Sequence, residues 1–363
     1  MSINRLYDTL RLKMKQLRPN ERETRLRNMI WMMIGILESK SVHLSKVAAK
    51  IPGRADNSSI VRRLSRFLDN AAVNVRSWYA PVARRWLEYV EDTSGQIRLI
   101  IDGTKIGRHH QLLMVALAWR KRAIPIAWTW VNSGKGHSGV QKQQALLTYV
   151  FSLVPGQSEV FLVGDTEFET VELMRQLETW GWSYVLRQRA STQVYVQDGW
   201  QSFGSLLAKA GQVLWLEQAR LTFKYAHGTH LLAYWKPGED EAWLLATNLS
   251  SCQAALKAYR CRMWIEEMFG DLKDHGFDLE ASRLVSFLRL SRLTLVVALL
   301  YVWMMTTGSR VIKNSCRSQV DRSDRRDLSI FQIGLRFIER LLTNAKLVPV
   351  AFVPILPSKL SGC

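Results

Sequence analysis

The sequence has few cysteines and few acidic residues, and it has no apolar run long enough to span a bilayer. Only four of its 363 residues are cysteine, and none lies in a CxxC pair or at a zinc-ligand spacing. A disulfide-stabilised scaffold is therefore excluded, and reduced thiols in the cytoplasm are expected. The longest apolar run, residues 293–305, has thirteen residues and is broken only by Thr294, whereas a membrane span needs about twenty. We expect a buried helix there and no membrane partner.

Positive charge is what the chain has in excess. Lysine and arginine number 50 against 31 acidic residues, so the formal net charge is +19. An excess of this kind most often meets a polyanion, and duplex DNA with its rows of phosphates is the commonest one. A basic surface kept for solubility or for membrane adhesion is the alternative. The apolar content of 47% excludes disorder as the main state, and the length fits about two domains.

Residues 1–93 are predicted to be helical and carry 18 basic against 9 acidic residues. A short amphipathic helix at 44–51 is broken by Pro52-Gly53. A second helix follows, and its first turn can be capped by Asp56, Asn57 or Ser58.

The second of these helices is predicted to point three arginines outward, namely Arg62, Arg63 and Arg66. Two short helices with a basic second one are typical of a helix-turn-helix that reads a DNA groove. A plain helical bundle with solvated arginines fits the pattern equally well, because such patterns have many false positives.

The hydrophobic period changes at Ile97, where strand-like runs begin to alternate with helical ones. Strands are expected at 97–101, 112–119, 123–131, 160–163 and 182–187, and helices at 140–154 and 170–179. This order indicates a mixed α/β fold. Short alternating runs over 188–250, one of them at 221–225, predict a small inserted antiparallel unit. The chain is helical again from 254, and the apolar face of its last helix, 330–342, is either core or a contact with a second subunit.

Two acids are expected to end strands, Asp102 in IIDGT and Asp165 in LVGDT. A carboxylate directly after a buried strand lies on the rim of the sheet, where open α/β sheets bind ligands. Two such carboxylates can share divalent metals about 3.5–4 Å apart, as in two-metal phosphodiester enzymes. An aspartate in an ordinary turn after a strand is the alternative.

The segment 259–273 has the pattern Y-x2-R-x3-E-x6-K, formed by Tyr259, Arg262, Glu266 and Lys273. On one continuous helix these side chains would fall near a single stripe. A face that mixes one acid with three phosphate-type donors suits a metal site against a nucleic-acid backbone. An ordinary i,i+4 salt pair between Arg262 and Glu266 is the alternative.

With these residues in place, the sequence resembles a DDE transposase of the bacterial insertion-sequence class, whose signature is Y-(2)-R-(3)-E-(6)-K. All four signature positions are matched, and the two upstream acids fall in the expected contexts. The resemblance covers roughly residues 97–295. In that family the second acid is usually followed by Arg-Gly-Phe or similar, whereas here Asp165 is followed by Thr166-Glu167-Phe168.

The resemblance implies an α/β fold with an RNase H-like mixed sheet core and an inserted antiparallel β subdomain, flanked by helical N- and C-terminal regions. The implied divisions are a helical DNA-binding domain at 1–93, a catalytic core at 94–187 and 251–300, a β-rich insertion at 188–250, and a helical C-terminal region at 301–363 that could contribute to dimerisation.

The resemblance also implies a function, that of a cut-and-paste DNA transposase that binds terminal inverted repeats and catalyses metal-dependent DNA cleavage and strand transfer. Asp102, Asp165 and Glu266 would be catalytic and would bind two Mg²⁺ ions, for which Mn²⁺ could substitute. Tyr259, Arg262 and Lys273 would contact phosphates near the transposon end. The implied partners are double-stranded DNA, as transposon ends and as target, and a second copy of the chain on that DNA. We expect a cytoplasmic, nucleoid-associated protein.

Two other functions remain open. One is a catalytically inactive, domesticated DNA-binding protein, and the other is an RNase H-like nuclease that does not recombine DNA. Detection of strand transfer would separate these from a transposase.

Overall fold

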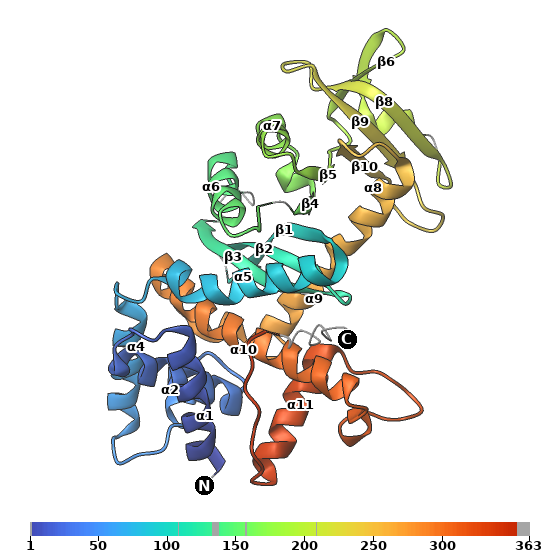
Figure 1. The fold of residues 1–363 in the computed structure, drawn as a ribbon. Coiled ribbons are helices and arrows are strands. Elements are labelled where there is room, and N and C mark those ends of the chain that lie inside the picture. Colours follow the sequence, from blue (N-terminus) through green and yellow to red (C-terminus); the bar gives the residue numbers. More distant parts are fainter. Residues whose placement is uncertain (1, 108, 133–137, 157, 208, 354–363) are drawn as a thin grey trace, which may run out of the picture. The chain divides into compact units, whose positions relative to one another are not determined.

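The computed structural model contains two compact units (Figure 1). It describes residues 2–107, 109–132, 138–156, 158–207 and 209–353. The sheet unit is Val90–Met268, and the helical unit combines Met1–Tyr89 with Phe269–Cys363. The boundaries expected from the sequence divide the chain more finely than these two units do. The end of the expected C-terminal region, 354–363, lies outside the described residues.

One mixed sheet forms the sheet unit. Its ten strands are hydrogen-bonded in the order β3-β2-β1-β4-β5-β10-β9-β8-β6-β7. They are β1 Gln96–Ile106, β2 His110–Trp119, β3 Arg122–Asn132, β4 Glu159–Gly164, β5 Ser183–Arg187, β6 Gln193–Val196, β7 Gly199–Ser202, β8 Val213–Leu221, β9 His227–Tyr234 and β10 Trp243–Thr247. In the described chain, β4 runs parallel to both β1 and β5, and the other pairs are antiparallel.

The β2–β3 hairpin at the edge of the sheet follows from a charged two-residue turn. Arg120 and Lys121 have φ angles of 48° and 61°, and they connect the paired residues Trp119 and Arg122. Two consecutive positive φ angles are typical of a type I′ turn, whose twist matches that of the strands it joins. The hairpin predicted from the sequence is confirmed.

Helices pack on the central strands of the sheet unit, which explains why those strands are apolar almost throughout. The helices are α6 Val140–Phe151, α7 Val171–Thr179 and α8 Cys252–Tyr259, and the start of α9 Met263–Leu272 also belongs to this unit. The first two lie side by side (Figure 1). α6 contacts β2 and β3, whereas α7 contacts β5 and α8 contacts both β4 and β5. The predicted mixed α/β class is confirmed.

The predicted antiparallel insertion is present, but it continues the core sheet. β10 pairs with β5 through Leu245 opposite Arg187 and Ala246 opposite Leu186, so β6–β10 extend the same sheet. The strand expected at 221–225 is wrong, because β8 ends at Leu221 and a turn follows in which Thr222 has a φ of 60°. The apolar and aromatic residues of that turn give a strand-like sequence pattern, although the segment does not form a strand.

Within the described residues, the helical unit contains the end of α9 and seven further α-helices. They are α1 Ser2–Leu17, α2 Glu23–Ser39, α3 Leu44–Ala48, α4 Asn57–Asp69, α5 Val75–Ser94, α10 Phe287–Lys313 and α11 Ile330–Thr343. The last residues of α5 belong to the sheet unit. Of the three candidate caps of α4, Asp56 is the one that acts, because its side chain accepts a hydrogen bond from Ser59 N–H.

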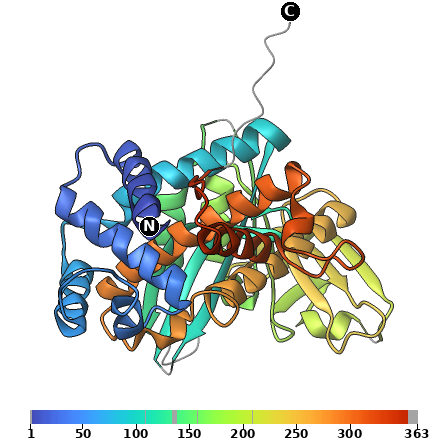
Figure 2. The same ribbon diagram turned by 90° about the horizontal axis from the view of Figure 1, so that it is seen from below.

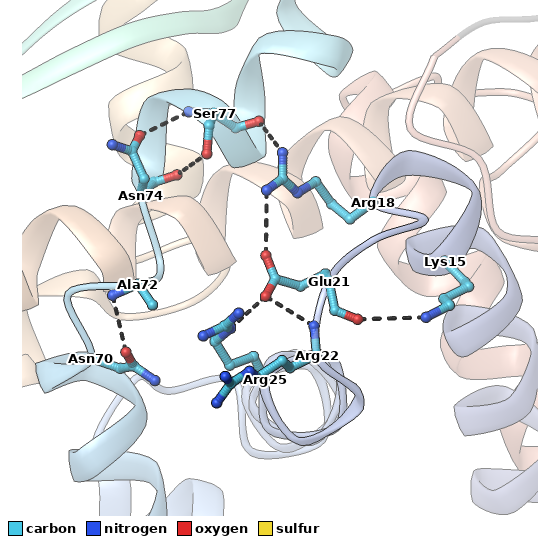
Figure 3. Close-up of polar contacts among 9 residues, drawn as sticks. All are labelled: Lys15, Arg18, Glu21, Arg22, Arg25, Asn70, Ala72, Asn74 and Ser77. Carbon is cyan, nitrogen blue, oxygen red and sulfur yellow. Dashed lines mark hydrogen bonds and ion pairs between the residues drawn. The ribbon is translucent and has the colours of Figure 1, made fainter.

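A buried carboxylate connects α1, α2 and α5 (Figure 3). The Glu21 side chain is only 4% exposed and pairs with Arg18 and Arg25. Arg18 also donates to the backbone carbonyl of Ser77 at the start of α5, over 3.0 Å. Burial alone would raise the pKa of Glu21, but the hydrogen bonds from Arg25, from Arg22 N–H and from Arg18 outweigh it and lower that pKa. The ionised carboxylate therefore stabilises this corner of the helical unit.

The α10 and α11 helices, orange and red in Figure 2, pack against each other, and two glycines lie where they meet. A Cβ atom on Gly308 would lie 1.9 Å from the carbonyl oxygen of Ile330, and one on Gly334 would lie 2.0 Å from that of Met304. Only glycine permits this approach. The apolar side of α11, including Phe331 and Ile338, is buried, so core is the correct alternative for this face.

α10 is long and apolar enough to cross a membrane by length and composition, with a mean hydropathy of 1.6 in its most apolar window. However, 78% of that window is buried inside the protein. Arg292 on this helix is also buried, and it donates to the carbonyls of Leu68 and Val73. These features agree with the buried helix expected from the sequence.

Candidate active site

The two aspartates are brought together by the register of two parallel strands. Ile101 of β1 pairs with Gly164 of β4, and this is the last pair between the two strands. Asp102 and Asp165 follow these residues on neighbouring strands, which lie about 4.8 Å apart in a sheet. The sequence thus predicted the right neighbours, and Asp165 directly follows β4 as expected.

The expectation that Asp102 ends its strand is wrong, because β1 continues to Ile106. The reason is that β1 has two partners of different length. Its parallel partner β4 stops at Gly164, whereas the antiparallel partner β2 continues to pair until Ile106 meets His110. Asp102 therefore sits inside β1 at the point where the parallel ladder ends.

Asp102 is a buried carboxylate with a charged neighbour. It is 6% exposed, and its Oδ1 accepts a hydrogen bond from Gly103 N–H over 2.7 Å. Burial and the negative charge of Asp165 raise the pKa of Asp102 to about 7, although Arg262 acts in the opposite direction. Two carboxylates in this arrangement repel each other, so their ionised forms favour a bound cation.

The predicted single helical stripe of Tyr259, Arg262, Glu266 and Lys273 is wrong. α8 ends at Tyr259, a 3-10 turn (η3) spans Arg260–Arg262, and α9 ends at Leu272 just before Lys273. A 3-10 turn has about 3.0 residues per turn against 3.6 in an α-helix. The interruption therefore rotates the residues before it relative to those after it.

Arg262 bridges two of the three predicted catalytic acids. Its Nη1 lies 3.2 Å from Asp102 Oδ2, and its Nη2 lies 2.6 Å from Glu266 Oε1. The Arg262 side chain is 13% exposed, whereas that of Glu266 is 45% exposed. The i,i+4 salt pair considered from the sequence is present, but it is half of a bridge from α9 to β1.

The donor set suits a hard divalent cation, because it consists of carboxylate oxygens. Asp102 and Asp165 are neighbours, and Glu266 is linked to Asp102 through one guanidinium. In the part of the chain that the structure describes, no three His, Cys, Asp or Glu residues come close enough to hold a metal ion together. Glu266 would thus have to approach the aspartates to complete a three-carboxylate site.

Tyr259 is placed differently from the exposed position expected on a helix face. It is 2% exposed, and its ring packs edge-on against Trp243 with centroids 5.1 Å apart. Burial raises the pKa of its hydroxyl to about 12. Among the described residues this hydroxyl has no hydrogen-bond partner. In this conformation Tyr259 supports the η3 turn and does not reach a surface phosphate.

The remaining predicted DNA contacts belong to the helical unit. The Lys273 ammonium lies 3.1 Å from Glu280 Oε1. Arg62 and Arg66 are exposed on α4 and Arg63 is partly exposed, as expected. Within the described ranges, none of these three arginines forms an ion pair with a carboxylate.

Glu167 stands two residues after the second acid, where the family usually has Gly, and its backbone N–H donates to Asp165 Oδ1 over 2.9 Å. Its carboxylate accepts hydrogen bonds from Gln111 Nε2 over 2.8 Å and from Ser138 N–H over 2.6 Å. Gln111 in turn occupies the space beside Gly103, where a Cβ atom would lie 2.1 Å from Nε2. Sequence reasoning missed Gln111, because a glutamine within an apolar strand gives no signal of its own.

Comparison with known proteins gives a family match over the same part of the chain. Residues 93–303 match the family described as "Transposase DDE domain". A cryo-EM structure of a piggyBac transposase synaptic complex with hairpin DNA aligns at 11% identity and a TM-score of 0.42, over 95% of this chain and 77% of that one. No curated protein matches the sequence.

Proposed function

The chain belongs to the Transposase DDE domain family, which matches more than half of its length, and we propose that it is a cut-and-paste DNA transposase. In this proposal it binds the terminal inverted repeats of a mobile element, cleaves DNA at the element ends and joins those ends to target DNA. Two ends must be held at once, so a homodimer assembled on DNA is part of the proposal. Its place is the cytoplasm, on the nucleoid.

The observation that carries the proposal is the bridge that Arg262 forms between Glu266 and Asp102, the neighbour of Asp165. Asp102 and Asp165 follow the last pair of the β1–β4 ladder, and Glu266 reaches the same guanidinium from α9. The sequence signature selects Arg262 and Glu266, and the strand contexts select the two aspartates, although 101 positions separate Asp165 from Glu266. A surface salt bridge by itself would not involve a carboxylate as buried as that of Asp102.

The three acids have distinct roles in the proposed chemistry. Asp102 and Asp165 would be the two ligands with fixed positions, because the sheet holds both. Glu266 would supply the third carboxylate from α9. Together they would hold two Mg²⁺ ions, which would activate the attacking oxygen and stabilise the leaving oxygen in an in-line displacement at phosphorus. Arg262 and Lys273 would hold phosphates of the transposon end, and Tyr259 would support the turn that carries Arg262.

The test is cleavage and joining of DNA that carries the inverted repeats flanking the gene, with Mg²⁺ present. Asp102→Asn, Asp165→Asn and Glu266→Gln should each abolish cleavage while end binding persists, because each removes a charged ligand and no phosphate contact. Glu267→Gln is the matched control, since Glu267 is the next residue of α9 and pairs with Arg122 over 2.9 Å. It should cleave like the unmodified protein.

The product pattern decides between the functions left open by the sequence. Joined products indicate a transposase, hydrolysis without joining indicates a non-recombining nuclease, and specific binding without cleavage indicates a domesticated DNA-binding protein. If the Asp102→Asn variant still nicks DNA at the normal rate, Asp102 is not part of the catalytic site.

A further inference from the structure

The connection between α10 and α11 contains a pocket lined by basic and hydroxyl side chains. Its volume is about 280 Å³, and its polar lining consists of Arg317, Arg322, Arg326, Ser315, Ser318 and Ser323. All six of these side chains are hydrogen-bond donors, and no carboxylate lines the pocket. The pocket lies wholly within the helical unit.

Ion pairs neutralise some arginines of this segment and leave two others. Arg317 binds the buried Asp321 with Nε over 2.6 Å, and Arg325 binds Asp327 over 2.8 Å. Arg322 and Arg326 are exposed, and within the described residues neither forms an ion pair or a side-chain hydrogen bond. The two arginines that line the pocket without a counter-charge are therefore available to an anion.

Several acceptor groups of the segment that forms the pocket are already occupied. Asp321 uses its second oxygen to accept a hydrogen bond from the backbone N–H of Arg322, over 3.0 Å. The last carbonyls of α10 accept from Asn314, Ser315 and Cys316. In contrast, the hydroxyls of Ser315, Ser318 and Ser323 make no hydrogen bond among the described residues. The positive charges of Arg322 and Arg326 and the unpaired hydroxyl donors thus both favour a negatively charged ligand.

We propose that this pocket, hereafter the α10–α11 pocket, binds a phosphodiester group of the DNA backbone. Arginine is well suited to phosphate because its planar fork can donate two hydrogen bonds at once. The lining includes no aromatic ring, no carboxylate and no side-chain amide, so it contacts the backbone and does not read bases. The inference rests on the proposed DNA-binding function and adds a second contact site to the arginines of α4.

The test compares binding of the full chain to duplex DNA across a series of salt concentrations. Arg322→Gln and Arg326→Gln should each weaken binding several-fold, and the double variant should weaken it about tenfold. Loss of one phosphate contact should also reduce the salt slope of the double variant by about 0.9. Arg325→Gln is the matched control, because it removes the same charge from the same segment but lies outside the pocket lining.

Three results would overturn the inference, and they are distinguishable. If the double variant has the affinity and slope of Arg325→Gln while both bind DNA, the pocket does not contact DNA and the proposed function stands. If the unmodified chain does not bind DNA at all, the proposed function fails as well. If inorganic phosphate raises the melting temperature only when Arg322 and Arg326 are present, but DNA affinity is unchanged, the pocket binds a small anion. Melting of the double variant at the normal temperature in phosphate-free buffer verifies its fold.

Discussion

Arg262 Nη1 lies 3.2 Å from Asp102 Oδ2, although 160 positions separate the two residues in the chain. The contact joins the η3 turn to β1, and the same guanidinium extends to Glu266. Asp102 is buried beside Asp165, so Arg262 supplies positive charge where two carboxylates repel each other. Arg262 thus has a role at the site beyond the salt pairing of an exposed helix.

Replacement of Arg262 by glutamine should impair cleavage far more than folding. We expect the rate of single-turnover cleavage of a pre-bound transposon end to fall about 100-fold or more. The reason is that displacing the reacting phosphate by about 1 Å can reduce the cleavage rate by that factor. Arg260→Gln is the matched control, since Arg260 is exposed on the same η3 turn. Thermal melting measured alongside separates lost chemistry from lost structure.

The same assay tests Lys273. Lys273→Gln should also lose cleavage, whereas Glu280→Gln, which removes the carboxylate 3.1 Å from that ammonium, should not. If the Arg262 and Lys273 variants both cleave at the normal rate, the signature match is a coincidence of charge patterning.

Glu21→Gln should destabilise the helical unit by about 2 kcal/mol at neutral pH, because several charge-assisted hydrogen bonds converge on this carboxylate. The folded protein holds the pKa of Glu21 below its ordinary value. Its stabilising effect is therefore complete above the unfolded pKa of about 4.3 and is lost as pH falls through the lower folded value.

Chemical denaturation at several pH values measures this effect. The difference between Glu21→Gln and the unmodified chain should be constant near neutrality and should shrink below about pH 4. Glu23→Gln serves as the control, because Glu23 is 47% exposed and pairs with the exposed Arg11. Its cost should stay below about 1 kcal/mol. If the difference in free energy of unfolding between Glu21→Gln and the unmodified chain does not change with pH, the loss of stability comes from packing and not from the charge of Glu21.

The sequence predicted the central strands, and the position of Asp165 directly after one of them, because these features are local. A buried strand needs only a run of apolar residues, and the β2–β3 turn needs only its own two residues. The extent of β1 beyond Asp102 was not predictable in this way, because it depends on how far β2 continues to pair.

The signature residues show a different limit of sequence reasoning. Spacing selected Arg262 and Glu266, and these two do pair. Spacing also assumed a continuous helix, and the 3-10 turn at Arg260–Arg262 breaks that assumption. The contact of Arg262 with Asp102 is set by the packing of the turn against β1. No helical periodicity contains that information.

Alanine at Gly308 or Gly334 should destabilise the chain, although alanine favours a helix by about 1 kcal/mol over glycine. Each new Cβ atom would overlap a backbone carbonyl of the other helix, and backbone cannot move aside as a side chain can. We expect a net loss of about 2 kcal/mol, as for overpacked cores. Gly228→Ala is the control, because a Cβ atom at that position would meet no other atom within 4 Å. Equal stability of all three variants would show that the α10–α11 crossing relaxes freely.

The arginines of α4 should contribute to DNA affinity without contributing to the fold. Arg62 and Arg66 are exposed, and neither pairs with a carboxylate in the described chain. The double variant Arg62→Gln/Arg66→Gln should therefore melt normally and bind duplex DNA more weakly, and addition of Arg63→Gln should weaken binding further. Each lost phosphate contact should lower the salt slope by about one.

The control for this prediction is Arg84→Gln/Arg85→Gln, which removes two exposed charges from α5 of the same unit. If α4 lies in a groove, the α4 double variant loses affinity and slope while the α5 double variant keeps both. If the two double variants lose equal affinity, the helical unit attracts DNA through its overall charge, and the helix-turn-helix interpretation of α3 and α4 is wrong. If neither variant changes binding, the contacts lie on another surface, and the α10–α11 pocket is the first to examine.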